Sequence, residues 1–396
     1  MQNLGKFFQI DQDIIFLNHG SFGATPLPVF EAYQAWQRRL ERQPVKFLGR
    51  DLPELLQTAR QALADYVGAG RDDLVFAPNA TFGVNVAARS LPLGPGDEVL
   101  TTNHEYGACT HVWQFLSGKR GFDLVERPLA PVGGNRLAVN GEQLWDASEV
   151  VEYFWQGVTP RTKVIYISHI TSPTAVTLPV ADICARARAA GILTVVDGAH
   201  APGQIPLDMA AIGADFYTGN CHKWLCAPKG SAFLYARPER QRLIEPLVVG
   251  WGWGEDREFS FGSDFLDYLQ WLGTHDPSAY LTVPAAIEFQ AAHGWTAVRE
   301  QCRALAREAL LRIGEITGLP PLYPPDSGFF RQMAAIPLPS RLDIKAFQAR
   351  LYDEYGIEIP GIEWRGRHFI RISVQGYNTQ ADVDALVAAV KELLKK

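Results

Sequence analysis

The chain has 396 residues, of which 47% are hydrophobic and 20% are charged. Its formal net charge of -6, without any clustered basic face, argues against a nucleic-acid partner. The N-terminus lacks the apolar stretch of a secretion signal, and no later run of about 18 uncharged apolar residues suggests a membrane span. We therefore expect a cytoplasmic protein of two or three domains that acts on small molecules.

The cysteines indicate a reduced compartment. There are five, an odd number without a C-x-x-C pair, which predicts neither a disulfide framework nor a structural zinc site: Cys109, Cys184, Cys221, Cys226 and Cys302. No metal site is expected elsewhere in the chain.

The chain begins with a short apolar strand in Phe16 to Gly23, which runs into a turn marked by glycines. Helices are predicted from Pro26 to Gln43 and from Pro53 to Val67, the second ending at Gly68. Short apolar runs then alternate with helical segments, at Leu74–Phe76, Glu98–Thr102, Lys163–Ile170, Ile192–Val196, Asp215–Tyr217 and Ser231–Tyr235.

The runs that begin at Lys163 and Ile192 are nearly continuous in apolar residues, as expected of strands covered on both faces. Such strands with helical crossovers predict a mainly parallel sheet in a three-layer α/β domain. Ligands of these sheets lie beyond the carboxyl ends of the strands.

Two stretches are less regular. Arg127 to Trp145 is rich in proline and glycine and predicts a loop or a small hairpin. Gly250 to Gly262 places aromatic residues among glycines and acids, which fits a pocket or subunit contact and equally a packed surface loop.

The last part of the chain predicts a smaller α+β domain. A helix from Pro284 to His293 begins the connection to it. We expect a large cofactor-binding domain at residues 21–283 and the small domain at residues 284–396. Residues 1–20 should form an N-terminal segment that packs on the small domain and the active site. The small domain should contain helices Trp295–Gly318, Lys345–Tyr355 and Gln380–Leu394, and strands Phe330–Ile336 and Phe369–Val374.

Two residues at strand ends suggest the chemistry. Asp197 ends an apolar strand, and Lys223 follows a later strand between His222 and Trp224. A pyridoxal phosphate enzyme needs such a pair, because a lysine forms the Schiff base while a carboxylate holds the ring nitrogen protonated. Other interpretations are open for each residue. Asp197 could instead cap the N-terminus of a helix, and Lys223 could be a solvated lysine in a loop. Lys229 is the other candidate for the lysine that forms the Schiff base.

The motifs around these residues resemble class V, fold type I pyridoxal phosphate enzymes, and most of all the isopenicillin N epimerase-like group, which includes sulfoxide C–S lyases. The motifs are Leu17–Gly20, Val196–His200, Thr218–Trp224 and Arg371–Asn378. The resemblance implies a three-layer α/β fold with a smaller α+β C-terminal domain, pyridoxal 5'-phosphate as cofactor, and an amino-acid-like substrate.

The resemblance also implies which residues bind the phosphate. The turn Asn79–Gly83 opens a helix, so that Ala80 and Thr81 match the phosphate loop, although an ordinary capping threonine is the alternative. Asn220 stands where relatives often have Ser or Thr, and His222 matches a phosphate-binding histidine. Thr274 resembles a residue that reaches the phosphate of the neighbouring subunit, which implies a homodimer with shared sites.

Further positions follow from the same resemblance. Tyr106 matches the position where relatives place an aromatic or imidazole ring against the cofactor face, and His104 is the alternative. His200 matches the residue that approaches the cofactor's phenolic oxygen or the substrate. Arg371 matches the arginine that grips the substrate carboxylate, unless it forms a structural salt bridge. Asn18 and His19 resemble residues that close over the substrate.

The reaction is left open by these residues. Lys223, once released, is placed to take the Cα proton, after which epimerisation, β-elimination or transamination can follow. The stretch Gly361 to Phe369 lacks the mobile cysteine of cysteine desulfurases, and Cys302 fits a buried helix thiol. The leading hypothesis is an epimerase, and the second hypothesis is a C–S lyase. The non-enzymatic alternative is a binding protein of the same fold whose site is catalytically inactive.

Overall fold

Seven strands form the main sheet, in the order β2-β10-β9-β8-β7-β3-β4. A computed structural model describes residues 3–129, 138–139, 142–143, 146–257 and 260–395. Strand β10 is antiparallel to β2 and β9, and the other neighbouring pairs are parallel. The strands are β2 (Leu74–Ala77), β3 (Glu98–Thr102), β4 (Asp123–Arg127), β7 (Thr162–Ser168), β8 (Leu193–Asp197), β9 (Phe216–Asn220) and β10 (Ala232–Ala236).

Successive residues of the central strands bury their side chains on opposite faces of this sheet. Ile165 and Ile167 of β7 belong to one hydrophobic cluster, whereas Val164 and Tyr166 belong to another. Helices α5 (Ala80–Ser90), α6 (Gly107–Arg120) and α10 (Asp264–Gln270) cover the second face. The first face packs on α4 (Leu52–Val67), α7 (Ala147–Trp155), α8 (Val180–Ala189), α9 (Met209–Ile212) and α12 (Val283–Ala292). The predicted three-layer α/β arrangement is confirmed.

Strand β4 was not expected from the sequence. It pairs only with β3 at the edge of the sheet, and its side chains are exposed or half-buried. The other strands are predicted from their runs of apolar residues. An edge strand with one face in solvent lacks such a run, so the sequence does not reveal it. In the predicted loop or hairpin of Arg127 to Trp145, β5 (Ala138–Val139) pairs antiparallel with β6 (Glu142–Gln143), and the residues around them lie outside the described part.

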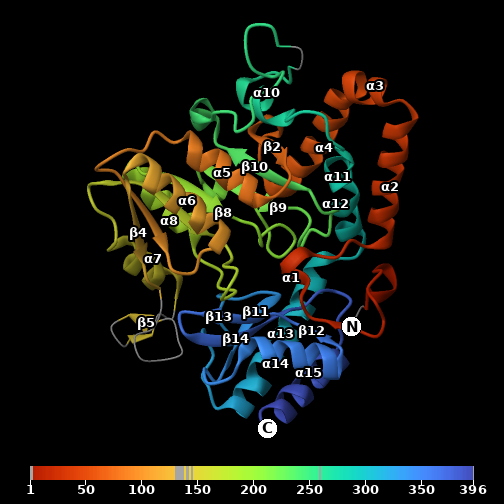
Figure 1. Cartoon of the computed structure of the whole chain (residues 1–396), viewed down its shortest axis with the longest axis vertical. Coiled ribbons are helices and arrows are strands. Elements are labelled where there is room, and N and C mark those ends of the chain that lie inside the picture. The colour runs from red at the N-terminus through yellow and green to blue at the C-terminus, as the bar shows by residue number, and fades with distance from the viewer. Residues whose placement is uncertain (1–2, 130–137, 140–141, 144–145, 258–259, 396) are drawn as a thin grey trace.

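The smaller domain contains a three-stranded antiparallel sheet in the order β11-β14-β13. Its strands are β11 (Met333–Leu338), β13 (Gly361–Trp364) and β14 (Arg367–Ser373). Helices α13 (Trp295–Thr317) and α14 (Ile344–Tyr355) pack on this sheet, and α15 (Gln380–Leu393) packs on both helices. The sheet lies in the blue lower part of Figure 1.

The N-terminal segment joins the small-domain strands. Strand β1 (Ile15–Phe16) pairs parallel with β12 (Ile357–Glu358), and the Ser373 amide donates to the Leu17 carbonyl at 2.8 Å. The short helix α1 (His19–Phe22) then crosses between the two sheets (Figure 1). The remaining helices are α2 (Leu27–Arg42), α3 (Pro44–Lys46) and α11 (Ser278–Leu281).

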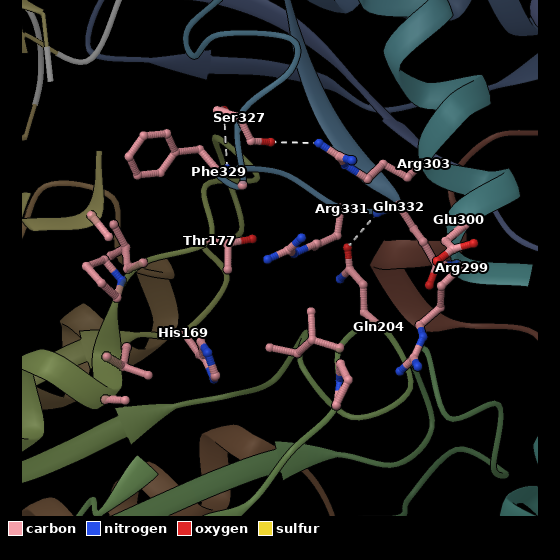
Figure 2. Close-up of a pocket in the computed structure, with 18 of the residues that line it drawn as sticks. His169, Thr177, Gln204, Arg299, Glu300, Arg303, Ser327, Phe329, Arg331 and Gln332 are labelled. Carbon is pink, nitrogen blue, oxygen red and sulfur yellow. Dashed lines mark hydrogen bonds between the residues drawn. The ribbon is translucent and has the colours of Figure 1, made fainter. Parts of the chain in front are cut away.

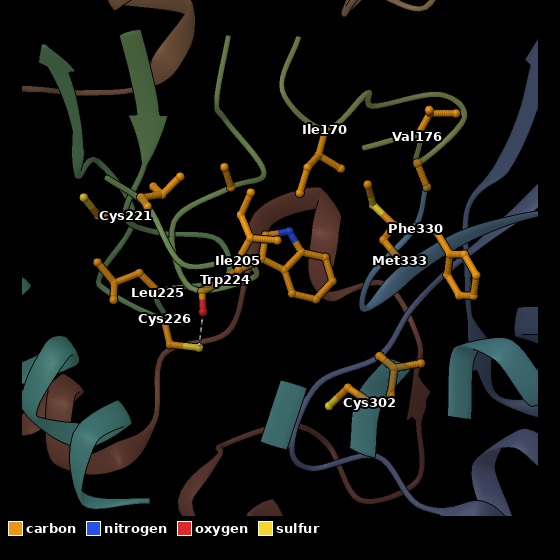
Figure 3. Packing of buried hydrophobic residues seen from close by; sticks show 14 of the residues in the cluster. Ile170, Val176, Ile205, Cys221, Trp224, Leu225, Cys226, Cys302, Phe330 and Met333 are labelled. Atoms are coloured by element: carbon orange, nitrogen blue, oxygen red, sulfur yellow. Dashed lines mark hydrogen bonds between the residues drawn. The ribbon is translucent and has the colours of Figure 1, made fainter. Parts of the chain in front are cut away.

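The main hydrophobic cluster includes residues of both domains. Trp224 and Ile205 follow strands of the large sheet, whereas Cys302 comes from α13 and Met333 from β11, and Figure 3 shows them together. Gly20 is packed so closely that an added Cβ would lie 2.9 Å from Met333 Sδ and 3.2 Å from the Trp224 ring. This shared core holds the loop after β9, where Lys223 lies, against the small domain.

Helix α12 packs on α2 and α4, whereas α13 packs on β11 and α15. The exact boundaries of 1–20, 21–283 and 284–396 stay predictions. None of the helices in the described part of the chain has the length and apolar composition of a membrane span.

Candidate active site

A cavity of about 260 Å³ lies beyond the carboxyl ends of the parallel strands, and we call it the active-site cavity. Nine of its lining residues are Ser21, Thr81, Tyr106, Ser168, Ser172, Asp197, His200, His222 and Lys223. Ser168 and Asp197 are the last residues of β7 and β8 and are paired in register. The sheet therefore brings together groups that lie far apart in the sequence, as the position of strand ends predicts.

Lys223 meets His200 inside this cavity, with 3.3 Å between Nζ and Nε2. The other ring nitrogen, Nδ1, accepts a hydrogen bond from the Trp224 indole at 3.2 Å. An indole N–H only donates, so a neutral His200 carries its proton on Nε2 and presents it to Lys223. The pKa of Lys223 is lowered to about 8, first by burial and then by the charge of Arg371. The site thus favours a neutral lysine amine.

Asp197 is a buried carboxylate at the base of the cavity, with 2% of its surface exposed. Its Oδ1 accepts the Ala199 amide at 2.9 Å, and its Oδ2 lies 3.4 Å from the Tyr166 hydroxyl. Burial raises its pKa, while the Ala199 amide and the charge of Lys223 act in the opposite direction. No cation lies within ion-pair distance of it among the described residues, so a cationic group in the cavity would complete its surroundings.

The N-terminus of α5 forms a cradle at one side of the cavity. Asn79 caps the helix by accepting the Phe82 amide at 2.8 Å, and Asn220 Oδ1 accepts the Ala80 amide at 2.8 Å. Thr81 lies between these two amides and lines the cavity. Ala80 and Asn220 line the cavity too, and the N-terminus of the helix favours an anion there. A contact of Asn220 with a phosphate stays a prediction.

His222 lines the same side of the cavity. Its Nδ1 lies 2.9 Å from the Ser231 carbonyl, which only accepts, so Nδ1 carries the proton of the neutral ring. Burial lowers the pKa of His222 to about 4. A phosphate dianion beside Nε2 would favour the protonated imidazole, because an opposite charge raises the pKa of a base.

Arg371 lies behind the cavity wall, with 4% of its surface exposed. Its Nη1 donates to the carbonyl and hydroxyl of Ser172, at 2.6 and 3.1 Å, and its Nη2 donates to Ser21 Oγ at 3.1 Å. Its Nε is buried without a hydrogen-bond partner in the described part. The guanidinium pairs with no carboxylate of the described chain, which leaves its charge for an anionic substrate group.

Tyr106 lines the cavity, whereas its alternative, His104, does not. The Tyr106 side chain is 46% exposed at the start of α6, where a ligand can cover it. His104 is buried, with Nδ1 2.7 Å from Thr174 Oγ1 and its ring against Trp364. Of the two rings, Tyr106 is the one placed to meet a cofactor.

Asn18 and His19 do not line the cavity, in contrast to the substrate contact expected of them. Asn18 Nδ2 donates to Glu358 Oε1 at 2.8 Å, and Asn18 Oδ1 accepts the Ser21 hydroxyl. His19 is fully buried, and its Nε2 lies 3.0 Å from the Lys223 carbonyl. Both side chains are engaged by the protein, through contacts that reach Ser21 and the Lys223 carbonyl, and a contact of either with the substrate stays a prediction.

Thr274 lies between α10 and α11 and is not brought to the cavity within one chain. The preceding Gly273 has φ +106°, a conformation that favours glycine. A phosphate contact by Thr274 therefore requires a second subunit.

Glu105 was missed by the sequence analysis. It is buried directly behind the cavity, where it accepts the hydroxyls of Thr102 at 2.7 Å and Ser168 at 2.5 Å. Its pKa is raised to about 8, chiefly by burial and to a smaller extent by the charge of Asp197. Glu105 stands between His104 and Tyr106, and no pattern in a single sequence distinguishes it from a surface acid.

These groups fit pyridoxal phosphate. Lys223 supplies an amine whose pKa is lowered to about 8, so that a large fraction of it is neutral near that pH. Asp197 supplies a buried carboxylate, and the N-terminus of α5 supplies a cradle for an anion. The fold and the site together define a fold type I pyridoxal phosphate enzyme.

Comparisons with known proteins agree with this class. The aminotransferase class-V model matches residues 23–386, and the chain belongs to that family. It is 38% identical to an isopenicillin N epimerase from Amycolatopsis lactamdurans, over 99% of this chain and 98% of the relative. It is 30% identical to a putative L-cysteine desulfhydrase 1 from Oryza sativa subsp. japonica, over 98% of this chain and 85% of the relative.

A solved structure with a similar fold is the cystine C–S lyase C-DES in complex with its reaction product, cysteine persulfide. The TM-score is 0.81 at 22% identity, covering 96% of this chain and 98% of the other. The predicted family and cofactor are confirmed, and the enzyme depends on pyridoxal phosphate.

Proposed function

We propose that this enzyme epimerises the Cα of an amino acid or aminoacyl substrate. The similarity to an isopenicillin N epimerase over nearly the whole of both chains carries this proposal. The active-site cavity supports it, because Lys223 and Asp197 lie there while Arg371 reaches its wall through Ser21 and Ser172.

Each residue has a role that its surroundings explain. Bound pyridoxal phosphate supplies an electron-accepting ring that acidifies the Cα–H bond of the amino acid. The Asp197 carboxylate holds a proton on the ring nitrogen, and the neutral amine of Lys223 accepts the proton from Cα. Arg371 binds the substrate carboxylate and so orients Cα toward Lys223. His200 Nε2 keeps the lysine amine in place.

The hairpin of β13 and β14 argues against persulfide chemistry. Residues Gly361 to Phe369 form paired strands around Arg365 and Gly366, and the stretch contains no cysteine. The described cysteines of the chain are all buried and free. Burial raises the pKa of Cys109, the thiol closest to Asp197, so that it stays protonated and weakly nucleophilic.

A second candidate is β-elimination from an S-substituted cysteine. The relative named as a putative L-cysteine desulfhydrase and the similar fold of a cystine C–S lyase favour it. Both reactions begin with loss of the Cα proton to Lys223, so the same residues serve either one. Transamination by the same groups is the remaining possibility within the family.

Incubation of the purified enzyme in deuterium oxide separates these reactions. An epimerase exchanges the Cα proton of isopenicillin N and inverts its configuration, which mass spectrometry and chiral chromatography detect. A lyase instead releases pyruvate and a sulfur product from L-cysteine or cystine. Release of pyruvate at a higher kcat/KM than epimerisation of any tested amino acid would contradict the first proposal.

We further propose a homodimer in which Thr274 contacts the phosphate in the partner's site. Support comes from the finding that Thr274 does not line the cavity of its own chain and from the exposed apolar side chains of Trp251 and Trp253. Mixing inactive Lys223→Ala with Thr274→Ala tests this sharing. A shared site restores activity in mixed dimers above that of Thr274→Ala, whereas a Thr274 acting within its own chain restores none.

The free, buried cysteines also support a cytoplasmic location as a proposal. Fractionation of the source cells with an antibody against the chain tests it.

A further inference from the structure

A second, larger cavity of about 910 Å³ lies between the large domain and α13. It shares no lining residue with the active-site cavity. We call it the arginine cavity after Arg299 and Arg303, both on α13, and Arg331, which precedes β11. Figure 2 shows the three side chains around it, together with Thr177 and Gln204 from the large-domain loops.

The three guanidinium groups have no carboxylate partner within ion-pair distance in the described part of the chain. Arg303 Nη2 donates to the Ser327 carbonyl at 2.7 Å, and Arg299 Nη2 donates to Thr296 Oγ1 at 3.2 Å. Both acceptors are neutral. These contacts hold Arg299 and Arg303 in place without neutralising their charges.

Acidic residues at this cavity do not reach the arginines. Glu300 is exposed to solvent. Asp146 is committed to the start of α7, where its Oδ1 accepts the Glu149 amide at 3.0 Å. His169 has a pKa lowered to about 4 by burial, so it is uncharged at neutral pH.

Several polar atoms at the cavity wall are buried and lack hydrogen-bond partners. Within the described part of the chain they are three donors, Arg303 Nε, Arg331 Nε and Thr177 Oγ1, and one acceptor, Gln332 Oε1. Arg331 extends into the cavity toward Thr177 in Figure 2. Native proteins satisfy almost all such atoms, and leaving them unpaired costs free energy. The three guanidinium groups that line the cavity match a ligand that offers hydrogen-bond acceptors.

The charges also act on one another. The pKa of Arg331 is lowered, first by burial and then by the positive charges of Arg303 and Arg299. Like charges this close repel, and the repulsion disappears when an anion lies between them. This concentration of positive charge is present in a chain whose formal net charge is -6.

We propose that the arginine cavity binds a small multivalent anion that carries phosphate or carboxylate groups. Phosphate and carboxylate oxygens accept hydrogen bonds without donating any, which matches the fork of donors on each guanidinium and the hydroxyl of Thr177. An anion with at least two charged groups can contact Arg331 and Arg303 at once. The cavity volume is within the range of small-molecule sites.

Titration calorimetry on the cofactor-loaded enzyme tests this site, because the bound cofactor already fills the phosphate cradle at α5. Pyrophosphate and citrate are the probes, titrated separately at matched ionic strength against chloride. Saturable binding of one molecule per chain is expected for at least one probe. The tighter probe shows whether phosphate or carboxylate groups are the preferred ligand chemistry.

The variants Arg331→Gln and Arg303→Gln should each weaken the binding of that probe by about tenfold or more, as expected for loss of a charged hydrogen bond. Arg341→Gln, at an exposed arginine outside the cavity, is the matched control and should change nothing. Arg331→Gln should not lower the melting temperature without the probe, because it removes like-charge repulsion, whereas Arg303→Gln also loses the hydrogen bond to the Ser327 carbonyl. The proposal is overturned if neither probe binds better than chloride, or if both cavity variants bind the probe as tightly as the wild type.

Discussion

The active-site cavity and the arginine cavity differ in how their polar groups are paired. In the active-site cavity, Lys223 contacts His200 and Asn220 contacts Ala80, so the protein itself aligns the reacting groups. In the arginine cavity, no hydrogen bond joins the side chains of the three arginines to one another within the described residues, and Arg303 and Arg331, like Arg371 beside the active-site cavity, keep buried Nε atoms without partners. A site that must orient a permanently held cofactor is pre-organised by its own contacts. In a site that exchanges a soluble ion, the bound ion supplies the hydrogen-bond acceptors for the polar groups of the protein.

The signs of the charges differ as well. The active-site cavity contains both an amine and a carboxylate, Lys223 and Asp197, whereas Glu105 behind it is kept neutral by burial. The arginine cavity is lined by three arginines and by two acidic residues, Asp146 and Glu300, which form no ion pair with these arginines in the described part of the chain. Variants in each cavity should therefore affect different measurements, and the following predictions run from the largest expected effect to the smallest.

Replacing Lys223 by alanine should lower kcat by at least about 10²- to 10⁴-fold, because the group that moves the Cα proton is lost. The visible absorbance of the lysine-bound cofactor should disappear as well. Lys229→Ala is the control, since this exposed lysine does not line the active-site cavity. Loss of the absorbance in Lys229→Ala, with retention in Lys223→Ala, would reverse the assignment.

Arg371→Lys should raise KM by about 10- to 100-fold, with a smaller effect on kcat. Lysine lacks the planar guanidinium that reaches Ser172 and Ser21 together and that can pair with a carboxylate through two hydrogen bonds. The loss of one charged hydrogen bond weakens substrate binding by about 10- to 100-fold. Steady-state kinetics measures both constants. Arg350→Lys, in an exposed pair with Glu354, should leave them unchanged. An unchanged KM in Arg371→Lys would contradict a role in carboxylate binding.

Glu105→Gln should change the pH dependence of stability. The folded-state pKa of Glu105 is raised from 4.5 to about 8, so the folded state binds the proton more tightly than the unfolded chain. The wild type therefore loses stability as the pH rises from about 4.5 to about 8, by an amount on the order of a few kcal/mol. Urea titrations at several pH values measure this loss.

In Glu105→Gln this contribution is absent. The variant should gain stability relative to the wild type between pH 5 and pH 8. Parallel stability profiles for both proteins over that range would show that Glu105 is ionised in the folded state.

Arg331→Gln should have the smallest effect on turnover. Without a multivalent anion, kcat/KM should stay within about twofold of the wild type, because the two cavities share no lining residue. A large loss of kcat/KM in this variant would show that the cavities are not independent.

The sequence could predict residues whose chemistry is tied to a strand end or a motif. Asp197 and Lys223 follow apolar strands, and the structure brings both into one cavity. Arg371 is on the predicted strand and reaches the wall of that cavity. These positions depend on local order along the chain, which periodicity and turn residues reveal.

Other positions depend on contacts between distant segments, which no local pattern contains. His19 matches a motif, but the burial of α1 against Trp224 and Met333 directs its ring to the Lys223 carbonyl. The arginine cavity is formed by α13, the segment before β11 and the loop after β7. On a helix with many arginines, Arg303 is indistinguishable from a solvated residue until the partner segments are known.

The hydrogen bond between His19 and the Lys223 carbonyl has a consequence for how the enzyme matures. His19 belongs to a segment that pairs with residues 357–358 and Ser373, so its position is fixed only when both ends of the chain have met. Contacts between such distant segments require large loop closures and form slowly. We expect cofactor attachment to be a late event of folding. In refolding experiments, the absorbance of the lysine-bound cofactor should appear after the tryptophan fluorescence of the core has reached its native value.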